Sequence, residues 1–208
     1  MNTEVPTTIK ANIGRLLGSV YYDRRDSAID ATRGWFHSTS AELGPEWLGS
    51  TAAFRKYLNQ DFYFLSLPGT LVLGSAARFE AASGPGQNYI VSERLRAGGA
   101  TTVRGYEDVS LELLAAEQSF TGRSSLLVWN EEIRFPLFRR FRGATFWDHA
   151  TLFGNFPLPD LAKNRNSVGG GIRLVLPFIL LRVDYGYPVT QDPVNNKGRW
   201  YFAIGQAF

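Results

Sequence analysis

One stretch of the sequence places an arginine among residues that leave the backbone unusually free. It reads GGATTVRGYEDVS, residues 98–110, and is too glycine-rich for a helix and too polar for a core strand. Arg104 carries a permanent charge with five donors, so burial would be costly without a partner. Gly105 would allow the chain to bend sharply or to pass close to another surface. The stretch therefore raises the question of which group Arg104 meets.

The other residues that could do chemistry form no catalytic or metal-binding pattern. The chain has two histidines, His37 and His149, and neither has the spacing of a motif such as H-E-x-x-H. Cysteine is absent, which excludes disulfides and thiolate metal sites, and there is no G-x-S-x-G nucleophile elbow. His149 follows Asp148, but neighbours on a strand point to opposite faces. We therefore expect no enzyme, cofactor or metal, and a Ser-His-acid esterase inside a barrel is the remaining enzymatic alternative.

A second glycine cluster, Gly169 to Gly171, also fails to match a chemical motif. It lacks the glycine spacing and the following helix of a phosphate-binding loop. Glycine inside a strand often marks a bend or a close approach of another group. We interpret the cluster as a place where strands bend or where a side chain needs room.

The elements that position these residues are predicted to be strands. Apolar and charged side chains alternate over long runs, as in LLRVDYGY at 180–187, and a period of two is typical of a strand. Turn signals such as Pro68-Gly69 separate the runs. The one helix-like stretch, 109–120, is interpreted as part of a long loop with one helical turn. The expected strands are 13–23, 34–43, 51–66, 70–82, 126–135, 142–153, 170–178, 179–187 and 200–208.

Composition excludes several classes of protein. The 208 residues fit one domain or one barrel, with no shift in composition that suggests a boundary. The net charge of +3 comes from interspersed signs, which argues against a nucleic-acid partner. No run of eighteen apolar residues exists, so a transmembrane helix is excluded. The N-terminus shows no secretory signal, so an exported protein would have this sequence as a processed form or a fragment.

The expected strands are longer than those of ordinary soluble sandwiches. Strands of about ten residues, with one apolar face, one charged face and aromatic residues near the ends, fit a transmembrane β-barrel. A soluble lipocalin-like barrel is the alternative, in which the apolar face would point inward. Phe208 at the end of the last strand favours the membrane barrel. In that case Leu181, Val183, Phe202 and Ile204 should face outward.

Several motifs in a fixed order resemble one known family. VRGY in a long loop, NEEIRFPL, FWD, the hairpin GGGIRLVLPFILLRVDYGYP and the terminal YFAIGQAF are similar to the C-terminal part of the barrel in the BamA/TamA superfamily. The upstream YYDRRDSAIDATRGWFHSTSAEL resembles the family's D-x-R-D … P-T-x-G strand pair, with Ala31 where proline is usual. The superfamily comprises outer-membrane β-barrel assembly proteins, organellar relatives and two-partner secretion pores. The chain lacks the length, and any candidate region, for the periplasmic POTRA domains of full members.

The resemblance implies a partner for Arg104. In this family the loop with the V-R-G-[FY] motif folds back into the barrel lumen, where its arginine meets an acidic residue of the wall. Carried over to this chain, Arg104 would pair with Asp148, with Glu132 nearby on the adjoining strand, while Gly105 lets the loop approach the wall and Tyr106 packs or hydrogen-bonds there. A carboxylate offers a bidentate, charge-assisted partner for a guanidinium. The alternative is a solvated outer loop in which Arg104 has no partner.

The resemblance also implies a role for the C-terminus. The last strand of such barrels carries a signal that the barrel-assembly machinery reads by adding a strand at the edge. The residues that would form this signal are Tyr201, Phe202, Ile204, Gly205 and Phe208. The simpler alternative is that Phe208 only fills the lipid-facing aromatic girdle.

Together these observations predict an all-β fold, an antiparallel transmembrane β-barrel of about 8–10 strands with a long inward-folding loop. The expected layout is an N-terminal tail at 1–12 and a barrel domain at 13–208, with loop 83–122 carrying the VRGY motif. Because nine strands cannot close in a fully antiparallel way, 13–23 lies outside an eight-stranded barrel, the tail adds a tenth strand, or the chain is a half-barrel.

For function, the resemblance implies an outer-membrane protein that inserts or translocates polypeptides. Its partners would be the lipid bilayer, the barrel-assembly machinery, and client outer-membrane proteins or a second copy of the chain. The alternative is a small structural or pore-forming barrel without insertase activity. The expected location is the outer membrane of a Gram-negative bacterium or of a derived organelle.

Overall fold

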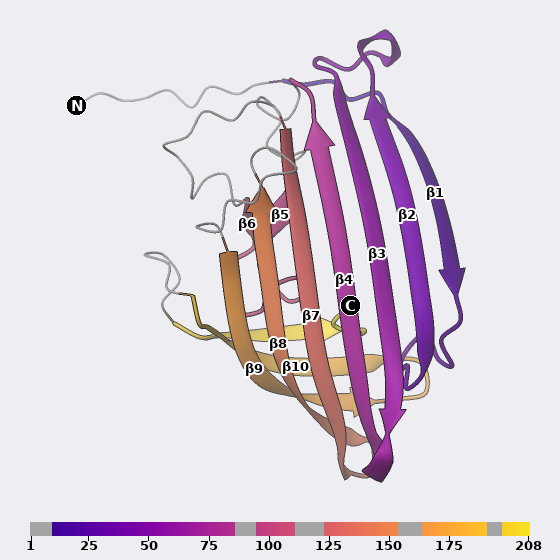
Figure 1. Ribbon diagram of the computed structural model, residues 1–208, viewed down its shortest axis with the longest axis vertical. Helices are drawn as coiled ribbons and strands as arrows, with labels where there is room; N and C mark the ends of the chain where they lie inside the picture. Colours follow the sequence, from indigo (N-terminus) through magenta and orange to yellow (C-terminus); the bar gives the residue numbers. More distant parts are fainter. Residues whose placement is uncertain (1–9, 86–94, 111–122, 154–163, 191–196) are drawn as a thin grey trace, which may run out of the picture.

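The computed structural model describes residues 10–85, 95–110, 123–153, 164–190 and 197–208, and within these ranges the chain is built almost entirely from strands. Nine of them form one antiparallel sheet in the order β1-β2-β3-β4-β7-β8-β9-β10-β11, and β5 pairs with β6 in a separate two-stranded sheet. Figure 1 shows the large sheet as a curved wall. The strands are β1 (Leu16–Asp23), β2 (Gly34–Gly44), β3 (Phe54–Leu67), β4 (Leu71–Ser83), β5 (Arg96–Ala97), β6 (Val109–Ser110), β7 (Arg123–Phe138), β8 (Phe141–Phe153), β9 (Asn164–Val175), β10 (Leu180–Pro188) and β11 (Arg199–Ile204).

The outer, convex face of the sheet is apolar and the concave face carries most of the charges. On β10, Arg182 and Asp184 are buried on the concave side, whereas Leu181 between β9 and β11 is 37% exposed. Phe202 and Ile204 on β11 are 78% and 72% exposed. The apolar side chains therefore point away from the interior, as a membrane barrel requires. In a soluble lipocalin-like barrel they would point inward.

The two ends of the sheet differ in their connections. At one end β3–β4, β7–β8 and β9–β10 are joined by short turns, and we call this the short-turn end. The chain segments 84–122, 154–163 and 189–198 connect strands at the opposite, long-loop end. Since each strand is antiparallel to its neighbour, β1 and β11 both run towards the short-turn end and are parallel to each other. Within the described residues they are the two edges of the sheet, and they are not paired.

These features confirm the all-β antiparallel fold and correct some of its details. Residues 16–23 pair with β2 along their whole length, which rules out the alternative in which 13–23 lies outside an eight-stranded barrel. Val109–Ser110 forms a short strand, and the other residues of the stretch interpreted as a loop with one helical turn lie outside the described residues. Residues 1–9 of the expected tail also lie outside them. No helix in the described ranges has the length and apolar character needed to cross a membrane.

The last strand is shorter than predicted. We expected alternation to continue to Phe208, but β11 ends at Ile204. Gly205 adopts φ of 95°, a left-handed conformation that only glycine reaches easily, and this turns the chain out of the sheet. Ala207 and Phe208 then become buried instead of continuing the exposed outer row of Phe202 and Ile204. The alternative in which Phe208 only fills the lipid-facing girdle is therefore wrong.

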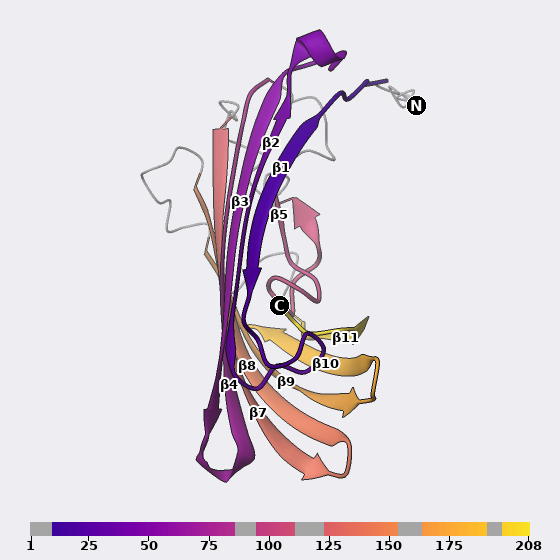
Figure 2. The same ribbon diagram turned by 90° about the vertical axis from the view of Figure 1, so that its right-hand side faces the viewer.

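The segment that carries the VRGY motif lies on the concave side of the wall. Figure 2 shows β5 and the following chain within the hollow that the large sheet partly encloses. This segment is closed on itself by β5 and β6 and by a hydrogen bond from the Gly99 amide to the Tyr106 carbonyl, 2.9 Å. We call residues 95–108 the lumen loop. Its inward position confirms the predicted inward-folding loop.

Candidate functional site

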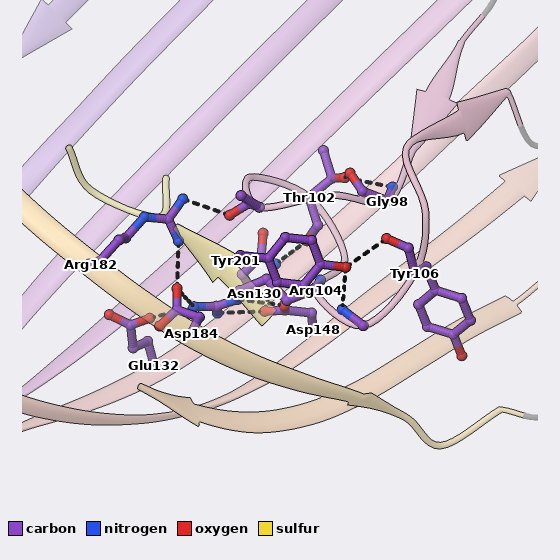
Figure 3. Close-up of polar contacts among 12 residues, drawn as sticks. Gly98, Thr102, Arg104, Tyr106, Asn130, Glu132, Asp148, Arg182, Asp184 and Tyr201 are labelled. Carbon is purple, nitrogen blue, oxygen red and sulfur yellow. Dashed lines mark hydrogen bonds and ion pairs between the residues drawn. The ribbon is translucent and has the colours of Figure 1, made fainter. Parts of the chain in front are cut away.

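Arg104 of the lumen loop meets Asp148 of β8 in a two-point ion pair. The guanidinium Nε and Nη2 donate to the two carboxylate oxygens, each at 2.8 Å, and the Arg104 amide also donates to Asp148 at 3.0 Å. Arg104 is 1% exposed and Asp148 is fully buried. Such bidentate, charge-assisted pairs are among the strongest hydrogen bonds in proteins. The pairing predicted for Arg104 is thus present, as Figure 3 shows.

A second carboxylate completes the surroundings of the guanidinium. Arg104 Nη1 donates to Glu132 of β7 at 2.8 Å, in agreement with the predicted nearby position of Glu132, and we call the contacts of Arg104 with Asp148 and Glu132 the lock. The ring of Phe146 lies under the guanidinium, with 3.3 Å between the Arg104 Cζ and the ring centroid. Burial alone would lower the pKa of Arg104, but the nearby carboxylates raise the pKa above its ordinary value. The guanidinium is therefore held charged and fixed on three sides.

The lock is part of a larger ion network on the concave wall. Glu132 also accepts from Arg173 of β9 at 2.7 Å and from Arg134 of β7 at 2.8 Å. Asp184 of β10 accepts from Arg173 and, at 2.7 Å, from Arg182. Each of these side chains is at most 3% exposed. The network spreads the contact of Arg104 over four neighbouring strands, β7 to β10.

Sequence reasoning assigned Arg173, Arg182 and Asp184 to a charged face but missed their place in this network. Asn130 was also missed, although its side-chain amide donates to Asp148 at 2.8 Å and to the Thr102 carbonyl at 2.6 Å. The signal that could have found these residues is their alternation, which puts them on the face of Asp148 and Glu132. Alternation does not give the register between strands, so it cannot say which residues meet.

Close backbone packing holds the loop against β10. Gly105 has φ of 101°, and a Cβ on Gly186 of β10 would lie 2.6 Å from both the Arg104 carbonyl carbon and the Gly105 nitrogen. Two glycines therefore face each other at the contact, where side chains would force the loop away. Gly105 therefore lies close to the wall, as predicted for it.

Two tyrosines fasten the same part of the loop. Tyr106 is fully buried, and its hydroxyl lies 2.9 Å from the Asn166 carbonyl and 2.8 Å from the Thr190 carbonyl. Tyr201 of β11 accepts a hydrogen bond from the Gly105 amide at 2.9 Å and donates to the Tyr106 carbonyl at 2.8 Å. Tyr201 therefore points into the concave side and binds the lumen loop (Figure 3). Its predicted neighbours in the C-terminal signal, Phe202 and Ile204, point outward.

The loop also rests on an apolar patch of the wall. Val103 and Tyr106 are fully buried in a cluster that includes side chains from β4, β7 and β8. Burying such surface contributes roughly 25 cal/mol for each Å² removed from water. The wall residues of this cluster are Ala82, Leu126, Val128, Ala150 and Leu152.

The glycine cluster of β9 makes room for the network, as predicted. A Cβ on Gly169 would lie 2.3 Å from the Phe146 ring, and one on Gly171 would lie 2.0 Å from the Asp184 carboxylate. A side chain at position 169 would therefore displace the Phe146 ring beneath Arg104. One at position 171 would displace the Asp184 carboxylate.

The C-terminal residues form a separate cluster near the short-turn end. The Phe208 ring stacks on Phe64 with centroids 6.0 Å apart and lies 5.9 Å from the Phe62 ring centroid. Ala31, from the turn between β1 and β2, is fully buried in the same cluster. Phe208 therefore connects the chain beyond β11 with β3 and with the β1–β2 turn, across the concave side.

The histidines lie outside the lock. His149 contacts Asn166 and Thr151 at 2.8 Å each, on the face opposite to Asp148, and His37 contacts Asp61 at 2.7 Å on the outer face. In the described part of the chain, no group of three or more His, Cys, Asp or Glu residues is placed to hold a metal. The site is thus an arrangement of ion pairs and hydrogen bonds that positions a loop.

Comparisons with known proteins agree with this architecture. Residues 7–208 match the model of the Omp85 superfamily domain. The outer membrane protein assembly factor BamA of Neisseria meningitidis serogroup B is 24% identical over 222 residues, covering 89% of this chain and 28% of that protein. The crystal structure of BamA from Haemophilus ducreyi lacking POTRA domains 1–3 superposes with a TM-score of 0.71 at 17% identity, covering 92% of this chain and 42% of that one.

The chain therefore spans less than half of each of these relatives, and the structural likeness concerns the fold. The family match, by contrast, extends over nearly the whole sequence and includes the lumen loop, the wall that binds it and the last strand. On this ground the chain belongs to the family defined by the Omp85 superfamily domain.

Proposed function

We propose that the chain is the barrel part of an outer-membrane protein that inserts or translocates polypeptides. The observation that carries the proposal is the contrast between a sheet half held by the lumen loop and a free edge at β1. Arg104 binds β7, β8 and β10 through side chains, whereas every residue of β1 is exposed. A sheet that is held at β7–β10 and has an unpaired strand at its β1 edge is suited to receiving an extended strand of another polypeptide.

The apolar outer face supports residence in a membrane. Trp129, Ile133 and Ile172 lie on this face and are 44%, 44% and 51% exposed. In water this surface would favour aggregation, whereas hydrocarbon would cover it. We propose the outer membrane as the location, in agreement with the name of the Neisseria relative, an outer membrane protein assembly factor.

The proposed partners follow from the same features. They are the lipid bilayer, the machinery that assembles barrels, and client polypeptides with an edge strand to pair. The C-terminal signal would consist of Phe202 and Ile204, which are exposed, of Gly205, at which the chain leaves the sheet, and of Tyr201 and Phe208, whose side chains lie on the concave side in the folded protein. The proposal assigns the protein no catalytic step and no cofactor.

The test is insertion of a second, small barrel protein into vesicles that contain the folded protein. We expect faster insertion than into empty vesicles, and loss of this acceleration in Arg104→Ala. Arg96→Ala is the matched control, since Arg96 lies in the same loop but pairs with Asp108 at the exposed surface. Ion conductance in planar bilayers without any acceleration would favour the alternative, a structural or pore-forming barrel.

A further inference from the structure

The turn between β7 and β8 has an unusual sequence for its geometry. Phe138 and Phe141 pair across it, so two residues, Arg139 and Arg140, connect the strands. Two-residue hairpin turns favour Asn-Gly or similar pairs because their backbones need positive φ. Arg139 adopts φ of 49°, one of two non-glycine residues with positive φ in the described chain. Strain of this kind, held at an arginine, points to a use for the side chain.

Both arginines are open to solvent and lie between aromatic side chains. Arg139 and Arg140 are exposed, and neither side chain forms an ion pair within the described residues. Phe138 is 63% exposed, and its ring centroid is 4.7 Å from that of Phe141. The turn therefore presents two positive charges without ion-pair partners in the described residues, directly beside the exposed ring of Phe138 and the partly buried ring of Phe141.

The neighbouring turn continues this surface. β9 pairs with β8 next to the arginine turn, and Phe178 in the β9–β10 turn is 91% exposed. Both turns lie at the short-turn end of the sheet (Figure 2). Aromatic residues at the ends of membrane-spanning strands suit the boundary between lipid tails and headgroups. A basic residue at the same boundary would meet the headgroup phosphates.

From this arrangement we propose that the Arg139–Arg140 turn binds anionic lipid headgroups in the leaflet at the short-turn end, with Phe138, Phe141 and Phe178 anchoring the turn at the boundary. The inference rests on the proposed membrane location but not on insertase activity. Two guanidinium groups at a two-residue turn can contact phosphates of adjacent lipids, while zwitterionic lipids supply no net charge to hold them.

The test uses the 208-residue chain folded into phosphatidylcholine vesicles with spin-labelled lipids, which give the association of phosphatidylglycerol relative to phosphatidylcholine. The test variant is Arg139→Asn/Arg140→Gly, because asparagine tolerates the positive φ of position 139, glycine accepts the backbone conformation at position 140, and both charges are removed. We expect the wild type to prefer phosphatidylglycerol and the variant to lose about fivefold or more of that preference.

Two controls make the outcome decisive. Lys10→Gln/Lys197→Gln removes the same charge from exposed positions at the long-loop end, and Arg139→Lys/Arg140→Lys keeps the charge at the turn. Both should retain most of the wild-type preference. The proposal is overturned if the Asn-Gly variant keeps the wild-type preference, or if the wild type shows none. Loss of insertase activity in any variant would not bear on it.

Discussion

Strands β7–β11 and strands β1–β4 belong to one sheet but are supported in different ways. The first group carries the ion network on its concave face, and Arg104 reaches Asp148, Glu132 and Asp184 there. The second group ends in β1, whose eight residues are all exposed, with Val20 and Tyr21 each 73% exposed. Backbone pairing joins all nine strands, whereas the ion pairs of the lumen loop lie on β7, β8 and β10, and we therefore expect the loop-bound half to be the more rigid one.

The two regions meet at few points on the concave side. Ala82 of β4 belongs to the apolar patch of the wall on which the lumen loop rests, and Phe208 packs on Phe64 of β3. Arg134 links these contacts to the lock, because it donates to both Glu132 and the Ala31 carbonyl and lies over the Phe64 ring at 5.2 Å. Substitutions in the loop-bound region should therefore cost far more than equivalent ones in β1.

The largest difference is expected for the lock itself. Arg104→Ala would leave Asp148 and Glu132 buried with fewer partners, and breaking a buried ion pair from one side costs about 3–5 kcal/mol. The free energy of unfolding in detergent micelles, from urea titration, should fall by this amount. Arg96→Ala removes an exposed pair with Asp108 and should cost less than about 1 kcal/mol. Equal effects of the two substitutions would contradict the account.

A pair of glycine substitutions compares the two regions directly. Gly186→Ala places a Cβ 2.6 Å from the loop backbone, whereas a Cβ on Gly18 of β1 meets nothing within 4 Å. We expect Gly186→Ala to destabilise the protein by about 1–3 kcal/mol through overpacking. Gly18→Ala should be neutral or should stabilise by up to about 1 kcal/mol. The same urea titration measures both, and a neutral Gly186→Ala would show that the loop does not press on β10.

The smallest difference is expected at the hydroxyl of Tyr201. Tyr201→Phe keeps the ring but removes the group that binds Gly105 and Tyr106, at a cost of about 1–2 kcal/mol. Tyr21→Phe in β1 changes an exposed side chain and should leave the stability unchanged. If thermal unfolding shows the same midpoint for both variants, Tyr201 does not hold the loop.

The sequence was sufficient to predict the strands and the core of the lock. Alternation placed Arg182 and Asp184 on one face of a strand and Leu181 on the other, and both assignments are confirmed. The pairing of Arg104 with Asp148 came from the family resemblance, because the two residues are 44 positions apart and no local pattern joins them.

What could not be predicted depends on register and on single backbone angles. Arg173 meets Glu132 only because β7, β8 and β9 align as they do, and pairing registers are not visible in alternation. Phe208 continues an alternating pattern, yet Gly205 turns the chain inward. Glycine occurs both inside strands and at left-handed turns, so its presence alone did not indicate where β11 ends.

Hydrogen exchange of backbone amides tests the central claim most directly, since it reports the opening of each strand separately. In the wild type, we predict slow exchange in β8 and β10 and fast exchange in β1. In Arg104→Ala, exchange in β8 and β10 should accelerate strongly while β1 stays as it was. Equal protection of β1 and β10 in the wild type, or unchanged exchange of β8 and β10 in the variant, would contradict the claim that the lumen loop makes one half of the sheet rigid.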